Sequence, residues 1–425
     1  MTKKSNTPRL SGTAFQETVE RYNAFFTELE KCFVHREQLI KFLKYGLIQK
    51  QHVLVFGPPG TSKTALFNKL TSRVNGSKIF KIELNMFMDD TALNGPYNPK
   101  VMREEGRLEH NIAGMLPEAD IARLGEFLDA NLPLLRSMLS ELNERVLERG
   151  SQVVDLPLVT AYCDTNVEPG QYLKRNEQAF AVLDRFLYMT YVDYLDSESD
   201  ITTMIKGFQN GSMHAFSGEL RLQDIQDLSR LTLEFPSMIR DEALFRAMGR
   251  IFHQYRVKRE QLIQSGKATV IFPKISDRRL CLATQTAEVT AILAAREYVL
   301  PEDLYSMELA LCSSVEEQAL LKSIIDEELK KLEKEREAEM NDAHCMALRG
   351  LISRIESFSV DLISDVNGLR ELSQALGEIE SELSKLKPES DTAKGMERNL
   401  KARLAEMRTK AEEKALKLAG LKKGG

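Results

Sequence analysis

The chain has 425 residues, with 58 Lys and Arg against 63 Asp and Glu, a net charge of −5 and 43% hydrophobic residues. This length predicts two or three domains with sizeable cores, and the slightly acidic balance makes nucleic acid unlikely as the main partner, which argues against that class of protein. The five cysteines stand singly, without the spacing of a zinc site or a disulfide framework, so we expect reduced thiols in a cytoplasmic protein. No apolar stretch approaches the ~18 residues of a membrane span, so we expect no span.

The N-terminal half has the pattern of an α/β domain. Residues 1–14 are polar and are expected to be disordered, and an amphipathic helix is predicted after them. From 15 to 198, strand-length apolar runs alternate with helical patterns, which is typical of a parallel sheet covered on both faces. Phosphate is expected at the carboxyl ends of these strands. The runs are 53–56, 79–84, 121–124, 157–162 and 187–192.

A phosphate-binding loop follows the first of these strands and opens a helical pattern. Its glycines let the backbone turn tightly and point N–H groups at a polyphosphate, and the helix that follows adds its dipole. In such a loop Lys63 reaches the β- and γ-phosphates and the Thr64 hydroxyl ligates Mg²⁺, so ATP and Mg²⁺ are the expected cofactors. Ser62 stands where the general pattern has glycine, and it fits if its φ stays negative. The binding residues are Gly57, Pro58, Pro59, Gly60, Thr61, Ser62, Lys63 and Thr64.

The rest of the chain is predicted to be helical. Residues 199–315 form one helical block, and 316–425 are nearly all helix by composition. In the last block the hydrophobic spacing of three then four predicts a coiled-coil seam, and 387–391 break it before a second helix, which suggests an antiparallel hairpin. This hairpin is either a spacer or dimerisation coil, or a specific docking element. The seam consists of Leu369, Leu372, Leu376, Ile379, Leu383 and Leu386.

Six landmarks in order resemble those of MoxR-family AAA+ ATPases, closest to the RavA-like branch, over roughly residues 30–315. Besides the phosphate loop they are 33–37, 106–120, 142–145, 183–186 and 276–279. The resemblance implies an AAA+ α/β nucleotide-binding domain with a parallel sheet, an α-helical lid at 199–315 and the C-terminal helical coiled-coil hairpin. It also implies ATP hydrolysis by a homo-oligomer, a hexameric ring, acting on a protein client that in this family commonly has a von Willebrand A domain.

The resemblance assigns catalytic roles to four residues. Glu126 is the carboxylate that polarises the attacking water, and Asn166 is the polar sensor, although Asp164 or Cys163 remain alternatives for that position. Arg185 is an arginine finger that acts on a neighbour's nucleotide. Arg278 is a sensor in the lid, and it places closure of the lid under the control of the γ-phosphate. The two arginines have an alternative reading as partners of the aspartates that precede them in the chain.

The acidic motif before this carboxylate departs from the family pattern. Gly125 stands where an aspartate normally holds the magnesium-bound water, and Arg123 occupies an otherwise apolar strand. Asp129 or Asp120 supplies the missing carboxylate only if the alignment slips by several residues. We therefore expect nucleotide binding and possible weakness of hydrolysis, and we expect aspartate at 125 to raise it.

Two function classes follow from these expectations. The first is an ATP-driven, chaperone-like remodeller of a protein partner. The alternative is a hydrolysis-poor, nucleotide-gated scaffold that recruits a partner through its C-terminal coil. An insert at 94–107, which carries two prolines and is not expected to be plain helix, is either a pore-facing grip for polypeptide or a surface loop.

Overall fold

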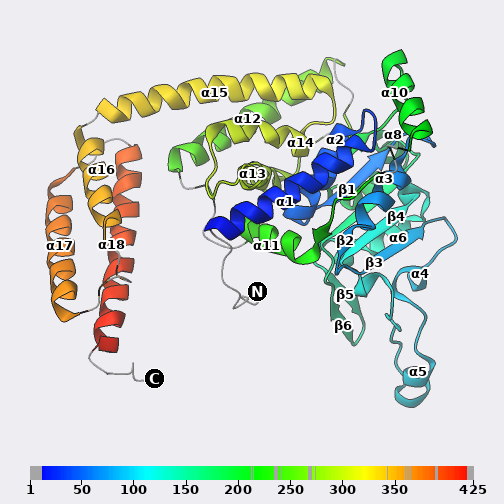
Figure 1. The fold of residues 1–425 in the computed structure, drawn as a ribbon, viewed down its shortest axis with the longest axis horizontal. Helices are drawn as coiled ribbons and strands as arrows, with labels where there is room; N and C mark the ends of the chain where they lie inside the picture. Colours follow the sequence, from blue (N-terminus) through cyan, green and yellow to red (C-terminus); the bar gives the residue numbers. More distant parts are fainter. Residues whose placement is uncertain are drawn as a thin grey trace. The chain divides into compact units, whose positions relative to one another are not determined.

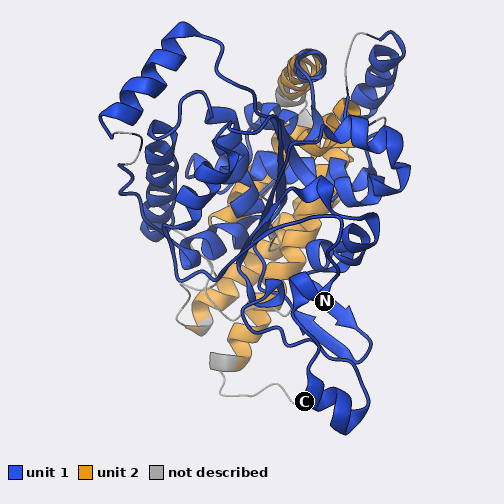
Figure 2. Ribbon diagram, turned by 90° about the vertical axis from the view of Figure 1, so that its right-hand side faces the viewer, with its two compact units in different colours: residues 1–240, 252–325 blue, residues 241–251, 326–425 orange. Residues whose placement is uncertain are grey.

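The computed structural model describes residues 12–418, except 212, 214, 234–237, 240, 267–269, 273, 342, 359, 361–362, 364 and 388–390. Of the stretch 1–14 predicted to be disordered, residues 1–11 lie outside the described residues, and 12–14 begin a helix instead. The chain divides into two compact units, residues 1–240 with 252–325 and residues 241–251 with 326–425 (Figure 2). The domain boundaries proposed at 198 and 315 stay predictions.

The helices and strands follow one another along the chain, and Figure 1 labels those for which there is room. In order they are α1 (Gly12–Lys31), α2 (Glu37–Gln49), β1 (His52–Phe56), α3 (Lys63–Thr71), β2 (Val74–Asn75), β3 (Ile79–Glu83), α4 (Thr91–Asn94), α5 (Pro99–Glu105), η1 (Leu116–Glu118), β4 (Ile121–Gly125), η2 (Phe127–Asp129), α6 (Leu132–Ser137), α7 (Leu139–Asn143), β5 (Val146–Arg149), β6 (Gln152–Asp155), β7 (Thr160–Thr165), α8 (Pro169–Arg175), η3 (Glu177–Ala179), α9 (Phe180–Leu183), β8 (Phe186–Tyr191), α10 (Glu198–Gln209), β9 (Leu220–Arg221), α11 (Leu222–Leu233), α12 (Glu242–Gln264), α13 (Asp277–Leu293), η4 (Pro301–Met307), α14 (Glu308–Leu311), α15 (Val315–Asn341), α16 (Ala343–Glu356), α17 (Val366–Lys385) and α18 (Asp391–Leu418).

The first unit is built on a five-stranded parallel sheet in the order β3-β4-β7-β1-β8. The predicted parallel α/β fold is confirmed, and each of the five predicted strands is present. The fourth begins at Thr160 rather than at Pro157, because proline has no N–H to donate to a strand ladder. All the carboxyl ends meet at one edge, where a phosphate-binding site is expected.

Helices cover both faces of this sheet. Along β1, Val53 lies against the α2 glycine Gly46, and on the same face the α3 ring of Phe67 contacts Tyr162 of β7 at 4.8 Å between centroids. The residues of β1 that alternate with Val53, such as Leu54, point to the opposite face, where they belong to a buried cluster with residues of α6 and α7. Because successive side chains of a strand point to opposite faces, this alternation fixes which residues face α3.

Helix α1 has the predicted amphipathic character. All five residues that predicted it are buried, namely Phe15, Val19, Tyr22, Phe26 and Leu29. Within the described residues, no helix combines the length and the apolarity needed to cross a bilayer.

The insert at 94–107 is not plain helix, in agreement with the expectation from its prolines: the short helix α5 stands between the non-helical stretches 95–98 and 106–107. Pro99 is the first residue of α5, a position where the missing N–H has no intrahelical partner in any case. Asn98 caps this helix by accepting a hydrogen bond from the Lys100 amide at 3.1 Å. At the base of the insert the Tyr97 ring packs on His110, so the tyrosine belongs to the base of the insert and not to a free tip.

The second unit contains the predicted pair of helices, α17 and α18, together with α16 and parts of α12 and α15. Residues of α17 and α18 share a buried cluster with α16, and the sequence reading did not predict this third member of the cluster. Five of the six seam residues are buried, from Leu369 to Leu383, and Leu386 is partly buried. The turn at 388–390 lies outside the described residues. The seam therefore faces helices of its own chain in this unit.

A cavity in this cluster should destabilise the second unit. Ile379 is fully buried, and replacing a buried isoleucine by alanine typically costs about 2–5 kcal/mol. We expect Ile379→Ala to lower the denaturant midpoint of this unit, followed by far-ultraviolet circular dichroism, while ATP binding by the first unit is unchanged. The neighbouring exposed substitution Ser373→Ala is the matched control. An equal loss in both variants would contradict the cluster.

Candidate nucleotide site

A cavity of about 360 Å³ lies at the carboxyl edge of the sheet. It is formed by the phosphate loop, the first turn of α3 and the ends of β4 and β7. The residues that line it are Pro59, Gly60, Thr61, Ser62, Lys63, Thr64, Ala65, Glu126, Asp164 and Asn166. Nine of these ten are phosphate-loop or catalytic residues proposed from the sequence, or the sensor alternative Asp164. Gly57 and Pro58 form the base of the loop, and the remaining lining residue is Ala65.

Lys63 lies at the centre of a polar network in this cavity. Its ammonium group donates to the carbonyl oxygens of Gly57 at 2.7 Å and Pro58 at 2.8 Å, and to Asn166 Oδ1 at 3.2 Å. The amide of Asn166 in turn donates to Glu126 Oε1 at 2.9 Å. Burial lowers the pKa of Lys63 and raises the pKa of Glu126. The network thus joins the phosphate-binding lysine to the proposed catalytic carboxylate through one amide.

The geometry favours Asn166 over its two alternatives as the polar sensor. Cys163 is buried and belongs to the hydrophobic cluster below the sheet. Asp164 lines the cavity, but its carboxylate is paired with Arg123. Only Asn166, of the three, contacts both Lys63 and the catalytic candidate, and an amide can orient water without adding negative charge beside a phosphate. Its role stays a prediction.

Two residues outside the phosphate loop, Arg36 and Tyr194, donate hydrogen bonds to its backbone carbonyls. The Arg36 guanidinium is buried and donates to Thr61 O at 3.2 Å and to Asp193 O at 2.9 Å. The Tyr194 hydroxyl donates to Pro59 O at 3.0 Å. These contacts orient loop carbonyls outward, which leaves the loop N–H groups free to face an anion.

Ser62 adopts a backbone conformation that the sequence reading did not expect. Its φ is +67°, in the left-handed region, whereas we had expected a negative value. This is the conformation for which glycine is favoured, and a side chain there costs on the order of 1–2 kcal/mol. Glu126 shares the feature, with a φ of +50° at the end of β4. Backbone strain of this kind often accompanies functional sites.

A buried guanidinium occupies the space below the cavity. Arg123, on β4, donates through Nη1 to Glu83 Oε1 at 2.5 Å. Its Nη2 donates to the Thr64 hydroxyl at 2.9 Å and lies 2.9 Å from Asp164 Oδ1. Burial opposes the charge, but the carboxylates of Glu83 and Asp164 outweigh it and raise the pKa of Arg123. Sequence reasoning noticed this arginine as odd but did not find its partners.

The glycine that ends β4 is explained by the same cluster. Gly125 pairs in register with Glu83 of β3, and an added Cβ would lie 1.8 Å from Glu83 Oε2. Aspartate at 125 would therefore require the outer end of the Glu83 side chain, which is 60% exposed, to move, and the expectation that aspartate there raises hydrolysis stays a prediction. Neither slipped alignment is supported: Asp120 lies at the amino end of β4, where it accepts from the Lys78 amide, and Asp129 does not line the cavity.

AAA+ ATPases generally bind nucleotide together with Mg²⁺, so this ion is the one to test against the residues present. The ligand expected from the sequence is the Thr64 hydroxyl, which here accepts a hydrogen bond from Arg123. The nearby carboxylate of Asp164 is held by the same guanidinium. Among the described residues no group of three or more His, Cys, Asp or Glu is arranged for a metal ion. This arrangement does not fit Mg²⁺.

The two proposed arginines lie at the opposite edge of the sheet from the cavity. Arg278 donates to Asp184 O at 2.7 Å, immediately before β8, and after the dominant effect of burial its pKa is further lowered by nearby Arg185. Arg145, which donates to Lys50 O at 2.8 Å before β1, belongs to the same basic group, because Arg278 contributes to lowering its pKa. Neither Arg185 nor Arg278 lines the cavity of its own chain.

The position of Arg278 corrects the role proposed for it, because it does not face the γ-phosphate site of its own chain. The alternative, in which Arg185 and Arg278 pair with the aspartates that precede them, is not supported either. Asp184 pairs with Arg279 at 3.6 Å, and Asp277 pairs with Arg256. Arg279 is the structural arginine, because it is buried and donates to the Phe186 and Leu187 carbonyls of β8.

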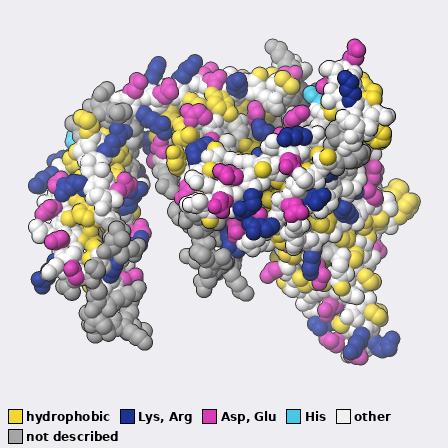
Figure 3. Space-filling model, in the orientation of Figure 1, with side chains coloured by type: hydrophobic (Ala, Val, Ile, Leu, Met, Phe, Trp, Pro, Cys, Tyr) yellow, Lys and Arg dark blue, Asp and Glu magenta, His cyan; other side chains and the backbone are white. Residues whose placement is uncertain are grey.

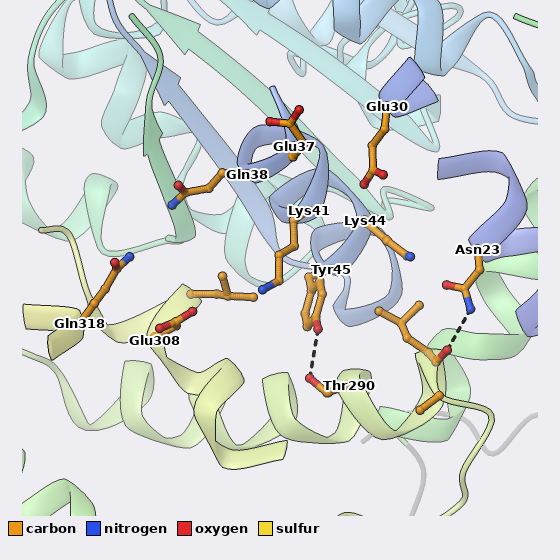
Figure 4. A pocket seen from close by; sticks show the side chains of 13 residues that line it. Asn23, Glu30, Glu37, Gln38, Lys41, Lys44, Tyr45, Thr290, Glu308 and Gln318 are labelled. Atoms are coloured by element: carbon orange, nitrogen blue, oxygen red, sulfur yellow. Dashed lines mark hydrogen bonds between the residues drawn. The ribbon is translucent and has the colours of Figure 1, made fainter. Parts of the chain in front are cut away.

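A larger cavity of about 620 Å³ lies elsewhere in the first unit. Figure 4 shows that α1, α2 and α13 contribute to it, with Tyr45 donating to or accepting from Thr290 at 3.1 Å. Carboxylates and ammonium groups alternate around it, among them Glu37 and Lys41, and no phosphate-loop residue lines it. Because charges of both signs line this cavity, it has no uniformly positive surface for a polyphosphate.

Comparisons with known proteins agree with this fold. Residues 20–230 match the family model of the MoxR domain in the MoxR-vWA-beta-propeller ternary systems. An uncharacterised protein of Methanocaldococcus jannaschii is 27% identical over 190 residues, covering 45% of this chain and 48% of that protein. The chaperone MoxR1 of Mycobacterium tuberculosis is 26% identical over 296 residues, covering 68% and 72%. The chain spans about half the length of the Methanocaldococcus relatives it matches.

A solved structure from Cytophaga hutchinsonii, provisionally described as an ATPase, has a TM-score of 0.54 to this chain at 17% identity, covering 75% of this chain and 96% of that one. The parallel sheet and its helices therefore have the same fold as that solved structure. By the family match, the region 20–230 is similar to the MoxR domain that the model describes.

The strain at Ser62 predicts that glycine stabilises the phosphate loop. Ser62 is exposed and its side chain has no capping hydrogen bond, so Ser62→Gly removes a steric cost of on the order of 1 kcal/mol. We expect a higher denaturant midpoint by circular dichroism, and Ser62→Val should lower it. Ser62→Ala, which keeps a Cβ, is the matched control. A midpoint lowered by glycine would contradict the left-handed conformation.

Proposed function

We propose that this protein is a nucleotide-dependent, chaperone-like remodeller of the MoxR type, which assembles into a homo-oligomeric ring and acts on a protein partner. The observation that carries the proposal is the network from Lys63 through Asn166 to Glu126 within the phosphate-loop cavity. Lysine neutralises the β- and γ-phosphates, and a carboxylate in reach of the cavity can accept a proton from attacking water. The RavA-like branch, the hexameric ring size and the cytoplasmic location remain predictions.

Assembly is supported by the basic group at the far edge of the sheet. Arg185 and Arg278 do not line the cavity of their own chain, and neither is paired with the aspartate that precedes it. Such groups are suited to a phosphate that belongs to a neighbouring subunit, where an arginine finger stabilises charge on the transferring phosphoryl group. The arrangement thus favours an active site completed between subunits.

A von Willebrand A domain is the partner that we propose. The description of the matching family model, which names MoxR-vWA-beta-propeller ternary systems, supports this choice. On the face drawn in Figure 3, acidic and basic side chains are interspersed over the first unit, which suits a protein partner better than a phosphate backbone. The second unit, in which α16, α17 and α18 share a buried cluster, is a candidate site for recruiting a partner.

The second candidate function is the hydrolysis-poor, nucleotide-gated scaffold. Gly125 in place of the usual aspartate, and Arg123 bound to Thr64, both favour it. The two candidates share nucleotide binding and the ring, and they differ in the rate of phosphate release. We expect slow hydrolysis, because the acidic motif retains only Glu126.

Nucleotide binding should depend on one lysine. Lys63→Ala removes the ammonium group that faces the cavity, and we expect ATP binding to fall below detection in isothermal titration calorimetry because the phosphates lose direct neutralisation. Lys100→Ala, at an exposed position of α5, is the matched control and should bind as the unchanged protein does. Equal affinity of Lys63→Ala and the control would refute the site.

Hydrolysis should depend on the neighbour's arginine. We expect Arg185→Ala to keep ATP binding while phosphate release from assembled protein falls by on the order of 10³-fold or more, as arginine fingers contribute in related enzymes. Glu126→Gln should be inactive as well. Mixing the two inactive variants should restore part of the activity, because some interfaces then contain an intact arginine and an intact glutamate. Loss of ATP binding in Arg185→Ala would instead place this residue in its own subunit's site.

A further inference from the structure

We propose that Arg123 takes the place of the metal ion in the nucleotide site, so that a nucleoside triphosphate binds there without a divalent cation. Lys63 and Arg123 then provide the positive charge that a lysine and a magnesium ion provide in other phosphate-loop proteins. This inference rests on the proposed nucleotide site and adds to it the form of the ligand, which is the metal-free nucleotide.

The first argument is the set of oxygens that Arg123 engages. Mg²⁺ in a phosphate-loop site takes the loop hydroxyl as a ligand, and carboxylates hold its waters. Here one nitrogen, Nη2, contacts both the Thr64 hydroxyl and the Asp164 carboxylate, while Nη1 contacts Glu83. A guanidinium has five N–H donors in a fixed fork and accepts nothing. It therefore satisfies these oxygens in the way that a hydrated cation does.

The second argument is the space around the guanidinium. Mg²⁺ requires a nearly octahedral oxygen shell at about 2.0–2.1 Å. The position that usually supplies an aspartate near this ion is Gly125 in this chain. There an added Cβ would lie 1.8 Å from Glu83 Oε2 and 2.7 Å from Arg123 Nη2. The room of the missing side chain is thus filled by the ion pair. A metal ion at the same hydroxyl would also be repelled by the adjacent guanidinium.

The third argument is that the arginine is held firmly. Arg123 is only 5% exposed, and it lies in the middle of a sheet whose neighbouring strands, β3 and β7, each contribute one of its carboxylate partners. Arginine keeps its charge throughout the ordinary pH range. The positive charge is therefore permanent, and it does not depend on the concentration of free Mg²⁺.

Calorimetric titration of the full-length chain with ATP, in EDTA and in millimolar Mg²⁺, tests the proposal directly. We expect the two dissociation constants to agree within about twofold, because the site already contains its cation. Binding that is at least about tenfold tighter in Mg²⁺ would overturn the inference. No substituted protein is needed for this comparison, so its result does not depend on the folding of a variant.

Substitution of Arg123 by the uncharged Met provides the second measurement. Arg123→Met releases Thr64, Glu83 and Asp164, and these oxygens can then bind a hydrated Mg²⁺. We expect binding about tenfold weaker in EDTA than in the unchanged protein, and recovery in Mg²⁺. Arg136→Met, at an exposed position of α6, is the matched control and should show neither effect. Circular dichroism confirms folding before each titration.

The outcomes separate the inference from the function on which it rests. If the unchanged protein binds no ATP in either buffer, the nucleotide site itself is refuted. If it binds ATP only in Mg²⁺, the site stands and the role of Arg123 is refuted. If folded Arg123→Met binds as tightly as the unchanged protein in EDTA, Arg123 does not contribute the missing charge, and the inference is again refuted.

Discussion

The guanidinium of Arg123 inside the central sheet is the constraint on which the nucleotide site depends. Removing a charge from water costs several kcal/mol unless the ion is paired and fully hydrogen-bonded. The chain pairs this guanidinium with Glu83 on one side and with Asp164 and Thr64 on the other, while its buried Nε has no hydrogen-bond partner among the described residues. Loss of one partner of such a buried group typically costs about 3–5 kcal/mol. Several positions of the site are therefore fixed together.

Gly125 shows how strongly these positions are linked. The absence of a side chain there is usually interpreted as the loss of a catalytic group, but the carboxylate of Glu83 occupies the space above it. Because β3 and β4 pair in register at these two residues, a side chain at 125 would have to be accommodated by movement of the Glu83 carboxylate. An aspartate in this place would also bring two carboxylates together, and like charges at this distance disfavour each other. The glycine and the arginine thus form one unit.

The sequence predicted the parts of this structure that depend on local pattern. Apolar runs located the five strands, and the phosphate loop was recognised because a strand and a helix flank it. What it did not predict depends on contacts between distant segments. The partners of Arg123 lie 40 and 41 residues away in the sequence. The positive φ of Ser62 depends on the path of the closed loop, which composition does not predict. Helix α16 lies in the block predicted to be nearly all helix, but its place in the cluster with α17 and α18 was not predicted, because it depends on packing between separate segments.

Strand β8 connects the two functional edges of the first unit. At its amino end it follows Asp184 and Arg185, beside the lid-derived Arg278. At its carboxyl end the Val192 amide donates to Phe56 O at 2.9 Å, directly before the phosphate loop. At Gly57 an added Cβ would lie 2.0 Å from Val192 O, so only glycine permits this approach.

One strand therefore carries the group proposed for a neighbour's phosphate and also supports the loop proposed for its own. β8 is an edge strand of the sheet and pairs in parallel with β1, with one irregularity in the register between His52 and Val53. The helices that contact β8 include α2 and α14, and also α13, whose Arg279 donates to the Phe186 and Leu187 carbonyls. In a ring, this continuity gives each subunit a mechanical connection between the interface it completes and the nucleotide it binds.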